Sequence, residues 1–472
     1  MPRALKPVDA DLLRHLHDIL PADCFRAEKE PYTTEPRGLF HGRAGVILAP
    51  GTTEQVAAIL RLASQVGTPV VPYGGGTSLV GGQVMPDGPD PIVLSLERMT
   101  QILDVSPVDG TISVQAGAIL QEVQQAAAAA GRLFPLSLAA QGSCRIGGNL
   151  ATNAGGLNVL RYGNARALCL GLEAVMPDGS IWHGLKRLYK DNTGYDLRDL
   201  LIGSEGTLGV ITAATLRLYP QPRAEATAVL VVPSPAAALD LLALAKGSFG
   251  ESISAFELIH GTGLEFLSET LPDVRQPFSK RPQWSVLVDI GLTAGGDPAE
   301  MLARFFQMAL DAGLVSDGVV SQSESQRRQL WHLRETIPEA NKRIGSIASH
   351  DISVPLSKIA EFIETTSVRI RELGEFRINC FGHLGDGNLH FNVFPPRGAL
   401  RRDSPVPADR IRRLVHDLVA EFGGSFSAEH GVGRLKVADL ARYGDPARLA
   451  AMRAIKAALD PAGIMNPGAI LA

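Results

Sequence analysis

Three histidines and a glutamate in two glycine-broken segments near the C-terminus are the residues best suited to chemistry. His383 and His390 lie seven positions apart, and Glu429 directly precedes His430. The glycines between the first two histidines disfavour a continuous helix and allow the chain to loop, so that both imidazoles can reach one ion. Two ring nitrogens and a carboxylate oxygen form a mixed site suited to zinc, with manganese or iron(II) as alternatives, and leave positions open for a substrate.

Residue chemistry alone leaves other readings of these segments open. A single histidine in a glycine loop is usually a hydrogen-bonding residue. Asp386 is a second candidate ligand, although its side chain can instead close the turn on its own backbone. Glu429 and His430 are neighbours, and neighbours in an extended segment point to opposite faces.

Three long glycine runs in the N-terminal half predict a binding site for a phosphorylated cofactor. They span residues 74–82, 142–156 and 202–212 and are mixed with Ser, Thr and Asn. Glycine lets backbone N–H groups approach phosphate oxygens that a Cβ atom would block. None of the runs contains G-x-G-x-x-G, so the usual dinucleotide fingerprint is absent.

The elements that carry these runs alternate between helix and strand. The pattern predicts a helix from Thr52 to Gly67 and another over 119–130, each ended by a glycine. It also predicts strands, each a short and mainly apolar run, over 69–73, 91–96, 111–116 and 209–218. The double proline in 219–222 then predicts a domain boundary.

The second half reads as an inserted α+β region followed by helices. Strands are predicted over 228–232, 285–290 and 389–393, and helices over 236–245 and 299–312. The sequence therefore predicts an α+β protein with a cofactor domain over 1–221, a cap over 222–406 and a mostly helical segment over 407–472.

Composition excludes several classes of protein. The formal net charge of -4 and the lack of a basic stripe argue against a nucleic-acid partner. The chain has no run of about 18 apolar residues, so no membrane span is predicted. Four scattered cysteines give neither a disulfide framework nor an iron–sulfur motif. The first residues lack the apolar stretch of a secretory signal, and early aspartates argue against a mitochondrial presequence, so we expect a cytoplasmic protein.

Several motifs, in order, resemble one flavoprotein family. The run 72–79 resembles the pyrophosphate loop of the vanillyl-alcohol-oxidase type of FAD domain, and the runs 146–156 and 203–209 resemble its next two flavin-contacting segments. The run 190–197 is similar to one in the D-2-hydroxyglutarate and D-lactate dehydrogenase branch of that family. The histidine motifs and the run 465–468 resemble the C-terminal part of the same branch.

The resemblance implies FAD bound between two α+β subdomains, beneath a cap domain. The first glycine run contains no histidine, so we expect the flavin to be noncovalent. The residues that it assigns to the cofactor are Pro72, Gly74, Gly75, Gly76, Thr77, Ser78, Leu79, Gly142, Ser143, Gly147, Gly148, Asn149, Thr152, Asn153, Gly155, Gly156, Glu205, Gly206, Gly209, Val210, Ile211 and Asn466.

The same resemblance implies roles at the second site. His383, His390 and Glu429 match metal ligands, and His430 matches a general base that also contacts substrate. Arg334 matches the residue that binds the substrate carboxylate, for which a guanidinium is well suited. Asn392 matches a further substrate contact.

These assignments predict an FAD-dependent, metal-assisted dehydrogenase of D-2-hydroxy acids. The expected acceptor is an electron-transfer protein or a quinone, and a homodimer is left open. A metallohydrolase and a noncatalytic flavin subunit of a larger complex are the competing hypotheses. A colourless protein would favour the first, and a chain that no hydroxy acid reduces would favour the second.

Two departures from the family pattern bear on the substrate. Relatives that use hydroxyglutarate have a threonine four residues after the arginine, where this chain has Pro338. They also have a lysine where this chain has Ser349. The missing groups would bind a second carboxylate, so D-lactate or another 2-hydroxy acid competes with D-2-hydroxyglutarate as the expected substrate. D-2-hydroxyglutarate stays in the comparison because Ser349, His350 or Lys342 could compensate for the missing groups.

Overall fold

The computed structural model describes residues 4–471, which divide into two compact units. The first unit contains residues 4–156, 163–221 and 429–471. The second contains residues 157–162 and 222–428. The chain passes from the first to the second between Gln221 and Pro222, inside the predicted boundary. The segment predicted over 407–472 is shared between the two units rather than forming one of its own.

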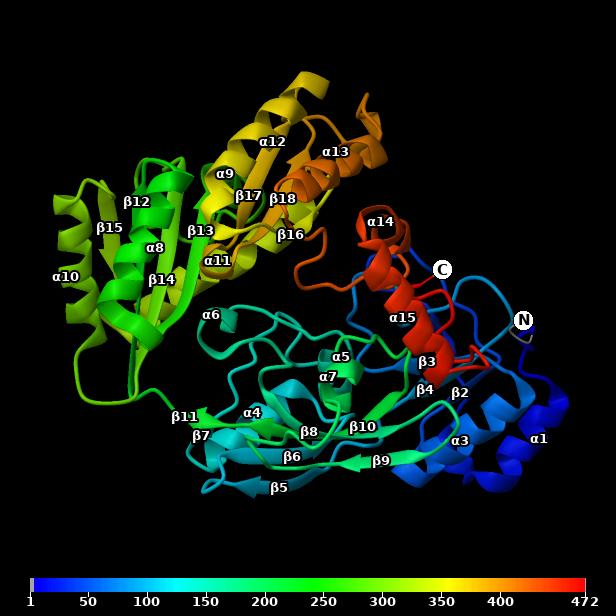
Figure 1. The fold of residues 1–472 in the computed structure, drawn as a ribbon. Helices are drawn as coiled ribbons and strands as arrows, with labels where there is room; N and C mark the ends of the chain where they lie inside the picture. Colours follow the sequence, from blue (N-terminus) through cyan, green and yellow to red (C-terminus); the bar gives the residue numbers. More distant parts are fainter. Residues whose placement is uncertain (1–3, 472) are drawn as a thin grey trace. The chain divides into compact units, whose positions relative to one another are not determined.

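A small, mainly parallel sheet begins the first unit. Its strand order is β1-β2-β4-β3, and its strands are β1 (Phe25–Arg26), β2 (Val46–Leu48), β3 (Val70–Tyr73) and β4 (Ile92–Ser95) (Figure 1). Helix α3 (Thr53–Val66) connects the parallel strands β2 and β3. Thr52 caps its first turn by accepting from the N–H of Gln55, and Gly67 ends it with a φ of 84°, as the sequence predicts.

A second, antiparallel sheet completes the first unit. Its order is β5-β6-β10-β8-β9, with β5 (Ile102–Ser106), β6 (Thr111–Gln115), β8 (Cys169–Val175), β9 (Ile181–Gly184) and β10 (Val210–Arg217). A two-stranded pair joins β7 (Arg132–Leu133) and β11 (Tyr219–Pro220). The remaining helices of this unit are α1 (Ala10–Ile19), α2 (Glu30–Thr33), α4 (Leu120–Ala129), α5 (Ile146–Ala151), α7 (Leu197–Leu201), α14 (Val437–Tyr443) and α15 (Pro446–Leu459).

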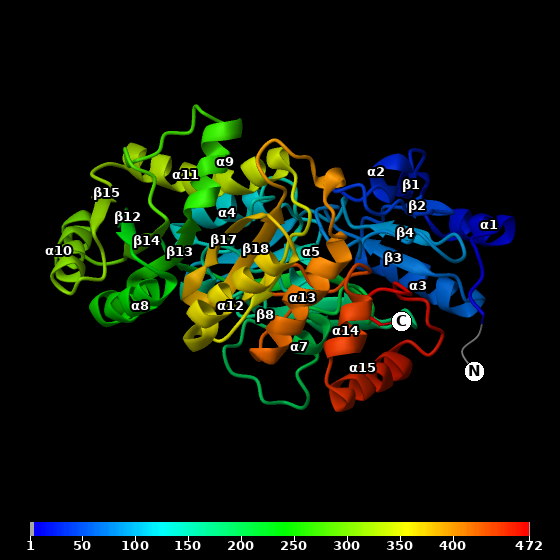
Figure 2. The ribbon, with the colours of Figure 1, turned by 90° about the horizontal axis from the view of Figure 1, so that it is seen from above.

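The second unit is built on a seven-stranded antiparallel sheet. Its order is β15-β12-β14-β13-β17-β18-β16, with β12 (Ala224–Val232), β13 (Ile253–His260), β14 (Trp284–Leu292), β15 (Asp317–Val320), β16 (Asp351–Ser353), β17 (Arg377–His383) and β18 (Asn388–Phe394). One face packs against α8 (Pro235–Phe249), α10 (Pro298–Asp311), α12 (Ile359–Leu373) and α13 (Ala408–Glu421). The other packs against α9 (Gly261–Thr270) and α11 (Glu324–Ile344) (Figure 2). The short helix α6 (Val159–Tyr162) contacts β13.

Strand alternation decides which side chains meet on the α9 and α11 face. Successive side chains of a strand point to opposite faces of the sheet. Leu258 of β13 therefore joins the core under α8 and α12, whereas Ile259 joins the core under α9 and α11. Glu257 shares the face of Ile259, and Phe381 of β17 belongs to the same core.

Helix α11 carries a proline at position 338, inside the helix. Proline has no N–H, so the carbonyl of Arg334, four residues earlier, lacks its helical donor. Pro338 itself is exposed, whereas Arg334 is buried.

The predicted elements agree with the structure except at their ends and where strands were not foreseen. For example, no strand is predicted at the residues of β13, which lies in the middle of the large sheet. All four cysteines are buried and free. Among residues 4–471, no helix has the length and apolar character needed to cross a bilayer.

Candidate active site

His383 and His390 sit on the hairpin formed by β17 and β18. His383 ends β17, a short 3₁₀ turn follows, and His390 lies within β18 opposite Phe381. The hairpin requires glycine at position 387, which has a φ of 86° and would place a Cβ atom 2.5 Å from the carbonyl oxygen of Val354. The two imidazole centroids are 5.6 Å apart, because both side chains leave the same face of the sheet.

Glu429 completes a set of three groups that could hold a metal ion. The ligand atoms of His383, His390 and Glu429 all lie within 4.8 Å of one another. The peptide N–H of Ala428 donates to the carbonyl of Asp351 (3.3 Å), so the chain itself holds Glu429 next to the histidine-bearing strands. Two imidazole nitrogens and one carboxylate match the ligand chemistry of zinc with an open coordination position.

Asp386 is the other acid close to the histidines. Its Oδ1 accepts the backbone N–H of Asn388 at 3.2 Å, which closes the turn as the alternative reading of this residue expects. Burial raises the pKa of Asp386 to about 6, and the opposing influence of His383 is smaller.

A buried glutamate connects His383 with Arg334. Glu257 is the cross-strand partner of His383, and its Oε1 lies 2.7 Å from the Nδ1 atom of that histidine. Its Oε2 accepts from Nε of Arg334 (3.0 Å) and forms an ion pair with Nη2 of the same guanidinium (2.7 Å). Glu257 and Arg334 are only 1% and 3% exposed, so no bulk water replaces these partners.

The charge state of Glu257 follows from these contacts. Burial alone would raise the pKa of its carboxyl, but the attraction of His383 and Arg334 outweighs burial and lowers the pKa to about 2. The side chain is therefore an ionised carboxylate at neutral pH. Sequence reasoning missed this residue. The available signal was a single acid inside the apolar run Ile253–His260, where an unpaired charge would be costly.

The predicted substrate contacts Arg334, Asn392 and His430 lie in buried or partly buried positions. The guanidinium carbon of Arg334 lies 4.8 Å from the centroid of the Phe381 ring. Asn392 is buried two residues after His390, and its Oδ1 accepts the N–H of His350 at 3.2 Å. His430 is partly buried directly after Glu429.

The three glycine runs converge within the first unit. A Cβ atom on Gly75 would lie 2.3 Å from the carbonyl oxygen of Ser143, and one on Gly74 would lie 3.3 Å from the Cα of Gly148. A Cβ atom on Gly206 would lie 2.9 Å from the side-chain Cγ of Pro72. These contacts bring the three runs together in one group, which we call the glycine cradle, and this agrees with the phosphate-binding role predicted for them.

The predicted cofactor residues lie on a few neighbouring elements. Those of the first run end β3 or follow it (Pro72, Gly74, Gly75, Gly76, Thr77, Ser78, Leu79). Those of the second run precede, form or follow α5 (Gly142, Ser143, Gly147, Gly148, Asn149, Thr152, Asn153, Gly155, Gly156). Those of the third run lead into β10 (Glu205, Gly206, Gly209, Val210, Ile211). Asn466 joins them, since its side-chain amide donates to the carbonyls of Gly82 and Glu205, both at 2.9 Å.

The carboxylate of Glu205 accepts hydrogen bonds from the segment that follows His430. Oε1 accepts the N–H of Val432 at 2.8 Å, and Oε2 accepts the N–H of Gly433 at 2.7 Å. Its backbone is in the left-handed region, with a φ of 49°. Burial raises the pKa of Glu205, and the two N–H groups offset this only in part. Glu205 thus anchors the backbone next to the predicted base, whereas its predicted contact with the cofactor stays a prediction.

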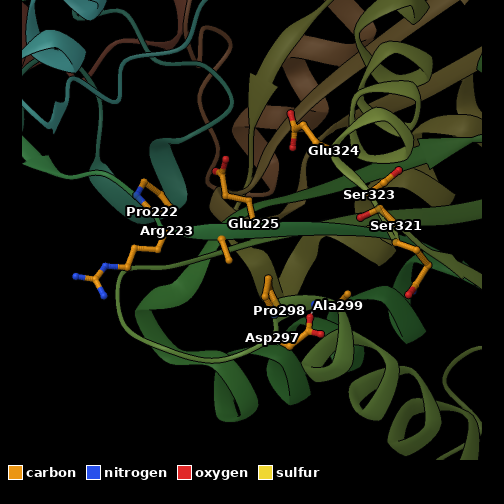
Figure 3. A pocket seen from close by; sticks show the side chains of 11 residues that line it. Pro222, Arg223, Glu225, Asp297, Pro298, Ala299, Ser321, Ser323 and Glu324 are labelled. Carbon is orange, nitrogen blue, oxygen red and sulfur yellow. Dashed lines mark hydrogen bonds between the residues drawn. The ribbon is translucent and has the colours of Figure 1, made fainter.

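A cavity of about 400 Å³ in the second unit is not the site of this chemistry. It lies at the β12–β15 edge of the sheet, where α10 and α11 begin, and contains none of the predicted residues (Figure 3). Three acids line it, Glu225, Asp297 and Glu324, against one arginine, Arg223. Such a lining disfavours an anionic substrate.

Two family models match the chain. A model described as "FAD binding domain" matches residues 44–184, and one described as "FAD linked oxidases, C-terminal domain" matches residues 221–470. Together they cover both units.

Known proteins agree with this match. The mitochondrial D-2-hydroxyglutarate dehydrogenase of Bos taurus is 39% identical over 465 residues, covering 98% of this chain and 83% of the relative. The D-2-hydroxyglutarate dehydrogenase of Xanthomonas citri pv. viticola is 40% identical over 427 residues, covering 89% and 88%. The solved structure of p-cresol methylhydroxylase with substrate bound matches with a TM-score of 0.75 at 15% identity, covering 98% of each chain, and supports the fold alone.

The fold is therefore of the vanillyl-alcohol-oxidase type, as the sequence predicts, and the binding of FAD is supported by the matched domain. The convergent glycine runs of the first unit agree with it. The chain is an FAD-dependent oxidoreductase that belongs to the FAD-linked D-2-hydroxyglutarate and D-lactate dehydrogenase family.

Proposed function

We propose that the chain oxidises a D-2-hydroxy acid to the corresponding 2-oxo acid with the help of a divalent metal held by His383, His390 and Glu429. The observation that carries the proposal is the meeting of these three ligand groups in a chain of the FAD-linked dehydrogenase family. Bound FAD would supply the acceptor for the hydride that leaves C2 of the acid and carries both electrons. Zinc is our first choice of metal, because two imidazoles and one carboxylate suit it.

Each protein group has a distinct task in the proposed reaction. A metal held by His383, His390 and Glu429 would lower the pKa of the substrate hydroxyl group. His430 then takes the hydroxyl proton as the general base. Arg334 binds the substrate carboxylate through its guanidinium, and Asn392 contributes a polar contact to the bound acid.

The proposed substrate is D-2-hydroxyglutarate or a D-lactate-like acid. The names of the Bos taurus and Xanthomonas citri relatives favour the first. The residues at positions 338 and 349 favour a D-lactate-like acid. Pro338 has no hydroxyl to offer a second carboxylate, and the Ser349 hydroxyl is already 2.7 Å from the hydroxyl of Ser346. Lys342 is exposed, and Nδ1 of the buried His350 lies 2.5 Å from the carbonyl oxygen of Phe391.

We also propose that electrons leave to an electron-transfer protein or a quinone rather than to a nicotinamide. The absence of a nicotinamide fingerprint in the sequence supports this choice. A cytoplasmic location and a homodimer stay predictions, and the relative from Bos taurus carries "mitochondrial" in its name.

Anaerobic bleaching of the flavin absorbance by a panel of D- and L-2-hydroxy acids tests the proposal. We expect D-acids alone to bleach the bound flavin, and treatment with a chelator to stop the bleaching until zinc is restored. His430→Ala should keep its flavin spectrum and lose reduction by the acid. A panel in which no hydroxy acid reduces the flavin, or unchanged reduction in metal-free protein, would overturn it.

A further inference from the structure

We propose that Glu257 is a positioning residue that serves the metal ligand His383 and the substrate-binding Arg334 at the same time. The inference rests on the proposed function, which gives those two residues their roles. Glu257 contacts neither metal nor substrate in this scheme. Its two carboxylate oxygens are divided between the two residues, Oε1 to His383 and Oε2 to Arg334.

The first half of the proposal concerns the orientation of the imidazole. The Nδ1 atom of His383 lies 2.7 Å from Oε1 of Glu257, whose other oxygen, Oε2, accepts from the guanidinium of Arg334. In the neutral ring that a metal requires, this contact places the ring proton on Nδ1 and leaves the lone pair of Nε2 for the cation. Carboxylates that accept from a metal-binding histidine fix its tautomer and increase the basicity of the ring.

The second half concerns the guanidinium. Oε2 of Glu257 accepts from the Nε–H of Arg334 and lies 2.7 Å from Nη2 in an ion pair. No hydrogen bond to Nη1 is found among residues 4–471. The remaining N–H groups form a second fork, along the Nη1–Nη2 edge, of the shape that a carboxylate fits. The Phe381 ring, 4.8 Å from the guanidinium carbon, supports the plane of that fork.

Sharing one carboxylate links the two functions. Glu257 is 1% exposed, so water cannot take its place if the carboxylate is removed. Losing it would free the His383 ring to rotate or change tautomer and would free Arg334 to turn its fork. Metal affinity and substrate affinity should therefore fall together in a single variant.

The second unit offers a matched control on the same helix and sheet. Asp289 of β14 is 2% exposed and accepts from Nε and Nη2 of Arg327, which lies on α11 like Arg334. It also accepts from the indole of Trp331 at 3.0 Å but contacts no histidine. Asp289→Asn removes a buried carboxylate from an arginine without disturbing a metal ligand.

The test measures zinc affinity of the FAD-loaded protein by competition with a chromophoric chelator. We expect Glu257→Gln to weaken zinc binding by about 10- to 100-fold and, at saturating zinc, to raise the hydroxy-acid concentration needed for half-maximal flavin reduction. Asp289→Asn should bind zinc like the parent. If Glu257→Gln does not fold, the double variant Glu257→Gln/Arg334→Met leaves no unpaired cation, and its zinc affinity gives the same answer.

His383→Ala separates failure of this inference from failure of the proposed function. If the parent and His383→Ala bind zinc equally, the histidines hold no metal and the proposed function fails. If zinc binding depends on His383 but Glu257→Gln retains the parent affinity, Glu257 does not position the ligand and the inference is overturned. Loss of affinity in Asp289→Asn to the same extent would also overturn it, since any buried carboxylate would then matter equally.

Discussion

The glycine cradle of the first unit and the sheet face of the second unit build their sites by opposite means. The cradle is formed by backbone atoms, and close approaches such as Gly75 to Ser143 depend on the absence of side chains. The site on the sheet face is formed by long side chains, and the carboxylate of Glu257 contacts both Arg334 and His383. A backbone site is therefore sensitive to added atoms, and a side-chain site is sensitive to a removed charge.

Each site also has one glutamate that uses both carboxylate oxygens, and the two glutamates differ in their partners. Glu205 accepts from two backbone N–H groups, whereas Glu257 accepts from two side chains. Burial raises the pKa of Glu205 in spite of its partners, whereas the partners of Glu257 overcome burial and lower its pKa. Neutral donors hold a segment in place, but a full positive charge is needed to keep a buried carboxylate strongly ionised.

The largest expected effect comes from removing the charge on the sheet face. Glu257→Ala leaves Arg334 buried without a carboxylate, which should lower the free energy of unfolding by about 3–5 kcal/mol. Urea unfolding followed by fluorescence measures it. Glu257→Ala/Arg334→Met should recover part of the loss, because no unpaired cation remains. A loss below about 1 kcal/mol would mean that the pair contributes no more than an exposed one.

The matching change in the first unit should cost less. Glu205→Ala leaves the N–H groups of Val432 and Gly433 without their acceptor. Val432 is partly exposed and only Gly433 is buried, so we expect a cost of about 1–3 kcal/mol. Hydrogen exchange should accelerate at these two amides. If exchange rises equally throughout the first unit, Glu205 stabilises that unit as a whole and does not anchor the segment locally.

Adding a methyl group tests the cradle. Gly75→Ala puts a Cβ atom 2.3 Å from the Ser143 carbonyl oxygen, so the backbone must move at a cost of about 1–3 kcal/mol. We expect weaker retention of FAD during gel filtration. Gly295→Ala is the control, because no atom lies within 4 Å of its added Cβ. Equal flavin content in both variants would show that this close approach does not shape the site.

The smallest effect is a pH dependence caused by Glu205. A carboxyl whose folded-state pKa is raised above 4.5 binds its proton more tightly when folded. It therefore reduces stability as pH rises from about 4.5 through the folded pKa, by about 1.4 kcal/mol per pKa unit. The unfolding free energy of Glu205→Gln should fall less than that of the parent over this range. Parallel pH profiles of the two proteins would contradict the assigned shift.

The two regions also differ in how far the sequence predicts them. The glycine runs are local motifs, so their residues could be recognised and their strands β3 and β10 predicted from the chain alone. The histidine hairpin was predictable for the same reason. The bridge from His383 through Glu257 to Arg334 was not, because its members lie 126 and 77 residues apart along the chain. Only the pairing of β13 with β17 and the packing of α11 bring them together.

The proline in α11 has a consequence for any attempt to redesign the choice of substrate. Replacing Pro338 with threonine would add a hydroxyl, but it would also return an N–H to the carbonyl of Arg334. The turn that carries Arg334 would then gain a backbone hydrogen bond. A substitution at this position therefore changes the backbone bonding of that turn as well as the polarity near it, so the two effects would have to be engineered together.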